Sequence, residues 1–202
     1  MIAVKTLKIG PKSHGRPISE WEFDAADFTQ GYKYEIIDGR IEVAAEPEPQ
    51  EFGLEDWLEG QLKTYAKSRP DIMDKVARKA RVYIPGRRRT TIPEPDIACY
   101  ADFPHDRLFE DLSWHEISPI LLIEVLVYGN PEKDLKRNVE LYLRIPTVQE
   151  YWVLDGRIHA AKPSLIQHRR LGSRWVVRTY RTGTTFTTKM MPGFELVLDP
   201  FA

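Results

Sequence analysis

The most apolar segment of the chain, residues 120–127, contains a single charged side chain, Glu124. Aliphatic residues stand on both sides of Glu124, so a strand formed here is buried on both faces. An unpaired ionised carboxylate in such a strand costs roughly several kcal/mol in desolvation. Three arrangements would offset that cost: a bound metal, a buried basic partner, or a strand end that reaches water.

The residues after this segment predict a second strand that lies parallel to the first. Asn130 is suited to cap a helix, and Pro131 is suited to its first turn. We expect a helix from Pro131 to about Leu143, followed by a strand at 149–155. A strand, a helix and a strand in so short a span favour a parallel βαβ unit with a right-handed crossover.

The stretch "YKYEIIDGRIEV" predicts a β-hairpin. Its two apolar runs flank Asp38 and Gly39, a pair that two-residue turns favour because both positions need positive φ. The resulting register places Glu35 opposite Glu42. Because like charges repel, this face is either solvated or lies near a cation.

The remaining segments predict a mixed sheet flanked by helices, of α/β or α+β type. Residues 1–17 contain several Gly and Pro and suggest a loose N-terminal arm, while residues 18–202 suggest a single domain. We expect helices at 20–28, with Ser19 and Glu22 as a capping box, and at 50–67. Strands are expected at 74–85 and within 92–103. Antiparallel strands joined by turns are expected within 157–170, 174–181, 184–189 and 193–199.

Composition indicates a soluble intracellular protein. The 202 residues are 42% hydrophobic and 29% charged, which is ordinary for a globular chain. Cys99 is the only cysteine, so an internal disulfide is excluded and a reducing cytoplasm is favoured. The first residues lack the apolar run of a signal peptide, and no segment approaches the roughly 20 apolar residues that span a bilayer.

Charge is unevenly distributed although the net charge is only −1. An acidic stretch at 42–59 is followed by a basic stretch at 75–89. The basic stretch either contacts nucleic-acid phosphates or forms an ordinary solvated face. The residues that we expect to contact nucleic acid are Lys79, Arg81, Arg87, Arg88 and Arg89.

Several other chemistries are disfavoured by the motifs that the sequence lacks. The histidines show no zinc-ligand spacing, and no G-x-S-x-G elbow supports a hydrolase triad. Neither a P-loop nor a G-x-G-x-x-G motif occurs, so we expect no nucleotide cofactor.

Three acids remain as candidates for a metal site: Glu35 on the hairpin, Asp96 at the start of a short strand, and Glu124. Asp96 and Glu124 are suited to neighbouring strands whose side chains converge. Carboxylates gathered in this way bind Mg²⁺, which activates water and neutralises charge on a phosphate. The alternative for Asp96 is a strand-start acid that accepts backbone N–H groups, and the alternative for Glu124 is a salt bridge at a strand end.

The chain resembles a known nuclease family. The segments "YKYEIIDGRIEV", "PEPDIACY", "LLIEVLV", "DLKRNVELYLRIPTVQEYWVLD" and "MPGFELVLD" resemble, in order and spacing, the Uma family of restriction endonucleases, compact members of the PD-(D/E)xK nuclease superfamily. The resemblance implies a restriction-endonuclease-like fold and a DNA endonuclease that depends on Mg²⁺ or Mn²⁺. Asp96 and Glu124 would be the metal ligands and Glu35 a further catalytic acid. Homodimers acting on DNA are also implied.

The sequence departs from the family at one position. The family usually carries a lysine on the helix after the second acid, about four residues before a tyrosine, but here Asn138 stands four residues before Tyr142. Asparagine forms hydrogen bonds but supplies no full charge. Lys79 or Arg81 would then have to supply the charge, or activity is weakened. The alternative is a non-catalytic nucleic-acid-binding or structural protein that retains the nuclease fold.

Overall fold

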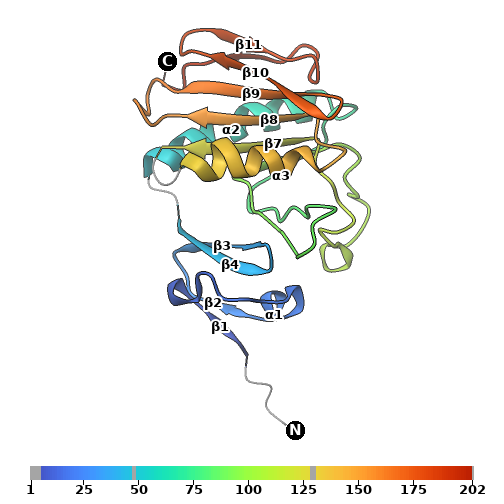
Figure 1. Cartoon of the computed structure of the whole chain (residues 1–202). Helices are drawn as coiled ribbons and strands as arrows, with labels where there is room; N and C mark the ends of the chain where they lie inside the picture. Colours follow the sequence, from blue (N-terminus) through green and yellow to red (C-terminus); the bar gives the residue numbers. More distant parts are fainter. Residues whose placement is uncertain (1–5, 47–48, 128–130, 202) are drawn as a thin grey trace.

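The computed structural model describes residues 6–46, 49–127 and 131–201, and its main feature is a six-stranded mixed sheet (Figure 1). The strand order is β10-β9-β8-β7-β6-β5. These strands are β5 (Lys75–Ala77), β6 (Ile97–Tyr100), β7 (Leu121–Leu126), β8 (Glu150–Asp155), β9 (Ser164–Leu171) and β10 (Arg174–Tyr180). The predicted mixed sheet flanked by helices is confirmed, and its mostly antiparallel pairing makes the fold α+β.

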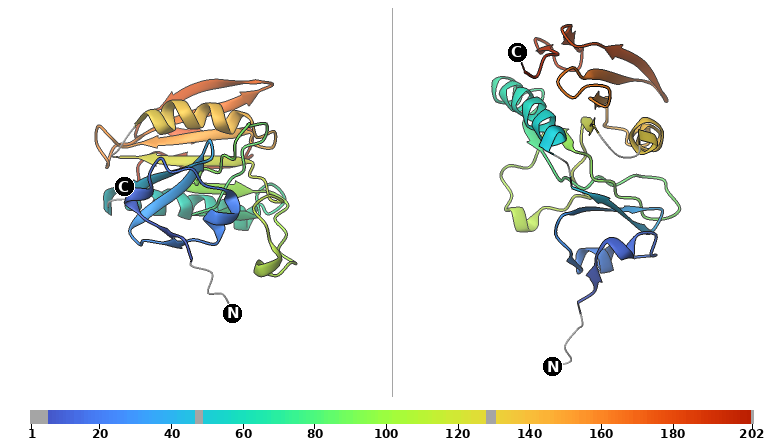
Figure 2. Two further views of the ribbon diagram at one scale, coloured as in Figure 1. Left: turned by 60° about the horizontal axis from the view of Figure 1, so that its bottom comes forward. Right: turned by 90° about the vertical axis from the view of Figure 1, so that its left-hand side faces the viewer.

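Helices α2 (Pro49–Ser68) and α3 (Asn138–Leu143) cover opposite faces of this sheet (Figure 2, right). The alternation of side chains along β7 divides the core between them. Leu121 and Ile123 pack in the cluster that contains the apolar side of α2. Leu122 and Leu126 pack in the cluster that contains α3. Glu124 shares the alternation of Leu122 and Leu126 and therefore faces α3.

The predicted parallel βαβ unit is present, because β7 and β8 pair in parallel with α3 between them in the chain. The start of the helix differs from a regular α-helix. Residues Lys133–Arg137 form a π-helical turn in which the Asn138 N–H donates to the Lys133 carbonyl. Such turns occur often at functional sites because they reorient side chains. The predicted cap Asn130 lies outside the described residues.

The predicted hairpin is confirmed as β3 (Tyr32–Ile37) and β4 (Arg40–Ala45). Asp38 and Gly39 form the turn with φ of 51° and 72°. Glu35 lies opposite Glu42, as the register predicted. Figure 1 shows the hairpin between the large sheet and the N-terminal segment.

The hairpin turn allows a stability test with two glycines of different geometry. Gly39→Ala is expected to lower the free energy of unfolding by about 1 kcal/mol, because alanine is strained at positive φ. Gly60→Ala, in the middle of α2 with no atom near the added methyl, is expected to raise it by about 0.5–1 kcal/mol. Chemical denaturation measures both, and equal shifts for the two variants would contradict the turn geometry.

The N-terminal residues differ from the expected loose arm in the part that the structure describes. Strand β1 (Lys8–Ile9) pairs in parallel with β2 (Asp27–Phe28), and Ile9 is fully buried. The segment is ordered because Ile9 packs in an apolar cluster with the hairpin. A single domain over 18–202 stays a prediction.

The first predicted helix is shorter than expected. Helix α1 (Glu20–Asp24) begins at the predicted capping box of Ser19 and Glu22. It ends before the predicted residue Phe28, because Asp27–Phe28 pairs with β1. Backbone pairing with a distant segment has replaced the last helical turn.

The strand expected at 74–85 is also shorter, since only β5 is regular. Lys79 has a φ of 55°, which interrupts an extended strand. Beyond it, Val82 and Ile84 donate backbone hydrogen bonds to Pro93 and Thr91 at 3.0 and 3.1 Å. The segment therefore folds back on itself outside the main sheet.

The expected C-terminal strands are present. Beyond β10, β11 (Thr185–Thr187) and β12 (Glu195–Val197) form a separate two-stranded antiparallel sheet. Over residues 6–46, 49–127 and 131–201, every helix is too short or too polar to cross a bilayer.

Candidate active site

Asp96 and Glu124 lie side by side on one face of the sheet. Ile97 pairs with Ile123, so continuing this antiparallel register by one residue sets Asp96 beside Glu124. The Val125 N–H donates to Asp96 Oδ2 at 2.7 Å, which fixes the Asp96 side chain on β7. The two carboxylates therefore meet at the edge of the core, as the sequence predicted for neighbouring strands.

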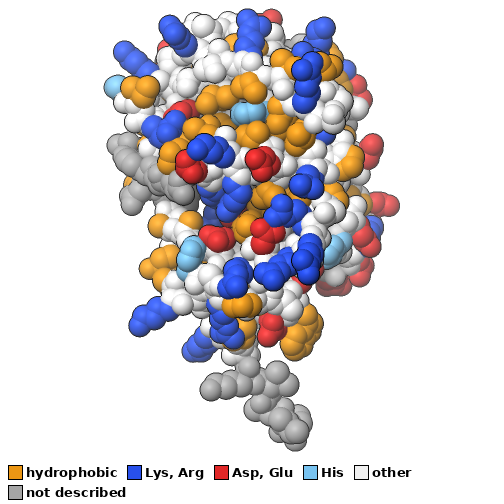
Figure 3. Space-filling model, viewed as in Figure 1, with side chains coloured by type: hydrophobic (Ala, Val, Ile, Leu, Met, Phe, Trp, Pro, Cys, Tyr) orange, Lys and Arg blue, Asp and Glu red, His pale blue; other side chains and the backbone are white. Residues whose placement is uncertain are grey.

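Both acids line a cavity of about 490 Å³ that we call the carboxylate cavity. It lies between the hairpin, the sheet, the first turns of α2 and the π-helical turn at Lys133–Arg137. Figure 3 shows Lys, Arg, Asp and Glu side chains gathered between the sheet and the hairpin. Its charged lining residues are Lys33, Glu35, Glu42, Glu46, Glu51, Glu55, Asp96, Glu124, Lys133, Asp134 and Arg137. Acids outnumber bases in this lining, which favours the binding of an additional cation.

Glu124 is buried, with 1% of its surface exposed. Its Oε1 accepts hydrogen bonds from Asn138 Nδ2 and from the Tyr142 hydroxyl, both at 2.8 Å. Burial and repulsion by Asp96 raise the pKa of Glu124 well above its ordinary value. No arginine is bonded to Glu124 in the part of the chain that the structure describes. The Glu124 carboxyl group is therefore held by two neutral hydrogen-bond donors and lies at the wall of a cavity.

Asp96 is paired with a lysine from the hairpin. Lys33 Nζ lies 2.8 Å from Asp96 Oδ1, and both side chains are about 15% exposed. Burial opposes the ionised carboxylate, but the charges of Lys33 and Lys133 outweigh it and lower the pKa of Asp96. Burial likewise opposes the charge on Lys33, yet the surrounding acids raise its pKa well above the ordinary value. The pair is therefore ionised.

Glu35 faces cations rather than solvent, which resolves the alternative that the hairpin register left open. Its Oε2 accepts from Arg137 at 2.9 Å, and its Oε1 lies 3.4 Å from Lys133 Nζ. The Glu94 N–H also donates to Oε1, at 3.0 Å. Although burial opposes the charge, Lys133, Arg137 and Lys33 lower the pKa of Glu35 to about 2.

The π-helical turn brings several polar side chains into this site. Lys133, Asp134 and Arg137 line the carboxylate cavity. Asn138, fully buried behind them, donates to Asp134 Oδ1 at 3.2 Å and accepts from Arg137 Nε at 3.0 Å. Asn138 thus reaches Glu124, while Lys133 carries a positive charge one π turn earlier.

Helix α2 contributes two acids that face the same site. Glu51 and Glu55 line the carboxylate cavity. Burial and repulsion by Asp96 raise the pKa of each to about 7. Arg78 bonds to Glu55 and, at 2.6 Å, to Asp56. Because both glutamates line the cavity, the first turns of α2 border the site.

The basic residues predicted to contact nucleic acid are divided between two places. Lys79 and Arg81 line a second cavity next to Asp96, where Arg81 pairs with Asp24. They do not line the carboxylate cavity. Arg87 pairs with Asp38, and the two residues after it, Arg88 and Arg89, are exposed; none of the three lines either cavity.

A metal site at this position would use few protein ligands. Within the described ranges, no group of three or more His, Cys, Asp or Glu side chains is arranged to hold a metal ion. Mg²⁺ is commonly bound by one or two carboxylates together with water and substrate phosphates. The oxygen donors of Asp96 and Glu124, side by side in an acidic cavity, fit that requirement.

Sequence reasoning missed Lys33, Lys133, Glu51 and Glu55. A signal for Lys33 was available, because strand alternation places it on the same face of β3 as Glu35. Glu51 and Glu55 have the i, i+4 spacing of one helix face within the acidic stretch. Lys133 had no local signal, since the π-helical turn that directs it is not evident in the sequence.

Comparison with known proteins agrees with this architecture. The solved structure of a "putative nuclease belonging to DUF820" from Anabaena variabilis ATCC 29413 superposes with a TM-score of 0.69 at 15% sequence identity, covering 90% of this chain and 96% of that one. This similarity shows a shared fold. None of the curated proteins matches the sequence.

The model of the Uma2 family, described as "Putative restriction endonuclease", matches residues 20–199. The match extends over nearly the whole chain and includes the hairpin, both acid-bearing strands and α3. It confirms the resemblance that the ordered motifs indicated. The chain therefore belongs to the Uma2 family.

Proposed function

We propose that this protein is a Mg²⁺- or Mn²⁺-dependent endonuclease that hydrolyses phosphodiester bonds in DNA, with Asp96 and Glu124 as metal ligands. The observation that carries the proposal is the adjacency of these two carboxylates on β6 and β7, at the wall of an acidic cavity. Membership in a family described as "Putative restriction endonuclease" supports DNA as the substrate.

The chemistry of the donors suits a hard cation. Carboxylate oxygens are the ligands that Mg²⁺ and Mn²⁺ prefer. When bound, such an ion supplies positive charge opposite the phosphate and activates water for attack. Asn138 and Tyr142 hold Oε1 of Glu124, and the Val125 N–H holds Oδ2 of Asp96, so both acids are fixed in orientation before any ligand enters.

Lys33 and Lys133 replace the charge that the family lysine would supply from position 138. Lys33 is bonded to Asp96, and Lys133 lies 3.4 Å from Glu35. Both ammonium groups line the carboxylate cavity, where they can balance the negative charge of an incoming phosphodiester. The role of the family lysine is thereby divided between the hairpin and the π-helical turn.

Glu35 acts as a positioning residue in this proposal. Both of its oxygens are engaged, by Arg137 on one side and by Lys133 and the Glu94 N–H on the other. It therefore fixes two cations near the site rather than reaching the metal. Its catalytic importance would be exerted through the placement of Lys133 and Arg137.

The proposal is tested by incubating the purified protein with supercoiled plasmid and Mg²⁺ or Mn²⁺. Nicked and linear DNA are expected with either ion and not with EDTA. A preparation of the Glu124→Gln variant, purified in the same way, serves as the control for contaminating nucleases. Equal cutting by the wild type and this variant would refute the assigned active site.

Two observations favour a second function, a non-catalytic DNA-binding protein with the nuclease fold. Asp96 already holds an internal counter-ion, Lys33, and Asn138 stands where the family carries a lysine. Calorimetric titration discriminates the two functions, because stoichiometric binding of Mn²⁺ that depends on Glu124 is expected only of the metal-dependent enzyme. Restored cleavage in Asn138→Lys, with an inactive wild type, would indicate a decayed nuclease.

Homodimer formation and a cytoplasmic location stay predictions.

A further inference from the structure

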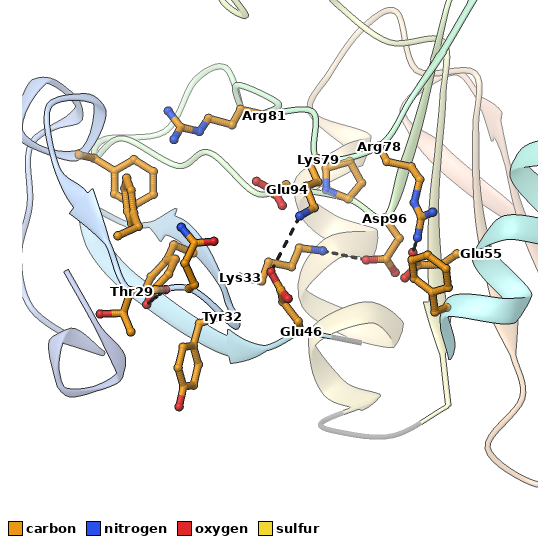
Figure 4. A pocket seen from close by; sticks show the side chains of 16 residues that line it. Thr29, Tyr32, Lys33, Glu46, Glu55, Arg78, Lys79, Arg81, Glu94 and Asp96 are labelled. Atoms are coloured by element: carbon orange, nitrogen blue, oxygen red, sulfur yellow. Dashed lines mark hydrogen bonds and ion pairs between the residues drawn. The ribbon is translucent and has the colours of Figure 1, made fainter. Parts of the chain in front are cut away.

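A second cavity, of about 550 Å³, opens next to the carboxylate cavity. We call it the aromatic cavity. Its lining includes the rings of Phe28, Tyr32 and Phe52 and the cations Arg78, Lys79 and Arg81. Lys33 and Asp96 line both cavities, so the aromatic cavity continues directly from the proposed cleavage site. Figure 4 shows Lys33 reaching toward Asp96 across it.

Aromatic rings form the apolar part of this cavity. Phe28 contacts Phe23 and Tyr34, with ring centroids 4.9 and 5.0 Å apart. These three rings pack in the apolar cluster that contains Ile9. Tyr32 and Phe52, in contrast, are 37% and 49% exposed. Large rings that remain open to solvent beside a cavity contribute little to the core and are available for stacking on a ligand.

Cations are placed around these rings. The Arg78 guanidinium lies 4.8 Å from the Phe52 ring centroid, and the Arg81 guanidinium lies 4.8 Å from that of Phe23. Lys79 has an 80% exposed side chain at the same cavity. Guanidinium groups stack on planar rings and bind phosphates. Arg78 pairs with Asp56, Arg81 with Asp24, and Lys79 lies 3.9 Å from Glu46, so a bound phosphate would compete with these acids for the cations.

We infer that the aromatic cavity receives one unpaired nucleotide of the DNA strand that is cut at Asp96 and Glu124, with its base stacked on Tyr32 or Phe52. This inference rests on the proposed function. A base within a duplex is stacked on its neighbours and cannot enter such a cavity unless it is extruded or already unpaired. The volume suits a single small ligand. Stacking on aromatic side chains accepts any base, because every base has a π-face.

The substrate that follows from this arrangement is DNA with an unpaired nucleotide next to the cleaved bond. Lys79 and Arg81 would contact the phosphate of that nucleotide, while Glu46 and Glu94 offer acceptors for exocyclic amino groups of the base. Fully paired DNA would fill the cavity only after a base is extruded from the duplex.

The test compares the affinities of two duplexes of the same sequence, one fully paired and one with a single unpaired 2-aminopurine nucleotide. Binding is measured by fluorescence anisotropy in EDTA at fixed salt, so that the DNA is not cut. The unpaired duplex is expected to bind about tenfold more tightly, which corresponds to one stacked base. Quenching of 2-aminopurine fluorescence on binding is expected as well.

Variants at the exposed ring assign the preference to this cavity. Loss of both the tenfold preference and the quenching is expected in Tyr32→Ala or in Phe52→Ala, according to the ring on which the base stacks, and Tyr32→Phe is expected to retain both. Phe201→Ala, which removes a 63% exposed ring that does not line the cavity, is the matched control and is expected to behave as the wild type. Retention of the preference in both Tyr32→Ala and Phe52→Ala would overturn the inference.

The inference and the proposed function fail in different ways. Equal affinities for the two duplexes, together with Mg²⁺-dependent cleavage, would overturn only the role of the aromatic cavity. A preference that Tyr32→Ala removes, without cleavage, would support the cavity and refute only the enzyme. Absence of binding to either duplex would overturn the inference.

Discussion

Replacing Asp96 by asparagine is expected to reduce metal-dependent DNA cleavage by about 10²- to 10³-fold, as for the loss of a major electrostatic stabiliser. The same change is expected to lower the free energy of unfolding by about 3 kcal/mol, because it breaks a buried ion pair. Asparagine keeps an acceptor for the Val125 N–H but leaves Lys33 without its counter-ion. Plasmid cleavage and chemical denaturation measure the two effects.

Glu124→Gln is expected to cause a similar loss of cleavage without the loss of stability. The glutamine carbonyl oxygen still accepts from Asn138 and Tyr142, and the repulsion between Glu124 and Asp96 disappears. The metal-free variant should therefore unfold at the same denaturant concentration as the wild type or higher. Mn²⁺ should raise the melting temperature of the wild type only, since a ligand stabilises the state that binds it.

A double variant separates the two roles of Asp96. In Asp96→Asn with Lys33→Met, no buried ammonium remains unpaired, so stability is expected to recover while cleavage stays low. Asp71→Asn, the same chemical change in an exposed pair with Arg69, is the control and should leave both properties unchanged. Cleavage by Asp96→Asn at the wild-type rate would contradict the assignment of Asp96 as a ligand.

Stability toward acid should depend strongly on Glu35. Its pKa is lowered from 4.5 to about 2 in the folded protein. A carboxylate with a lowered pKa stabilises the fold above its unfolded pKa, and this contribution is lost as the pH falls from about 5 to about 2. The shift corresponds to about 3 kcal/mol. Relative to Glu35→Gln, the wild type should lose that advantage over this range of pH in denaturation experiments.

Glu42→Gln is the matched control for this experiment, because Glu42 lies opposite Glu35 on the same hairpin. The Glu42 side chain is 38% exposed and lies 3.7 Å from His14, so its contribution is expected to be small. The Glu42→Gln variant should show the acid dependence of the wild type. An identical dependence in Glu35→Gln would contradict the ionised, buried state of Glu35.

Local sequence patterns determined the elements that hold the candidate site. Asp38 and Gly39 fixed the hairpin turn, and strand alternation then set Glu35 opposite Glu42. The apolar run around Glu124, followed by a helix and a second strand, predicted the parallel pairing of β7 and β8. The sequence also indicated that Asp96 and Glu124 suit neighbouring strands whose side chains converge, and the pairing of β6 with β7 places them so.

The tertiary structure alone decided which charges surround these acids. Lys33 reaches Asp96 from a hairpin 63 residues earlier in the chain. Lys133 is directed by a π-helical turn, and Lys79 interrupts its predicted strand at a φ of 55°. Such features follow from the packing of distant segments and from the electrostatic balance of a buried cavity. Strand alternation places Lys33 on the same face as Glu35, but short-range patterns do not show which distant segment that face meets. The sequence therefore identified the two acids, and the fold showed which cations pair with them.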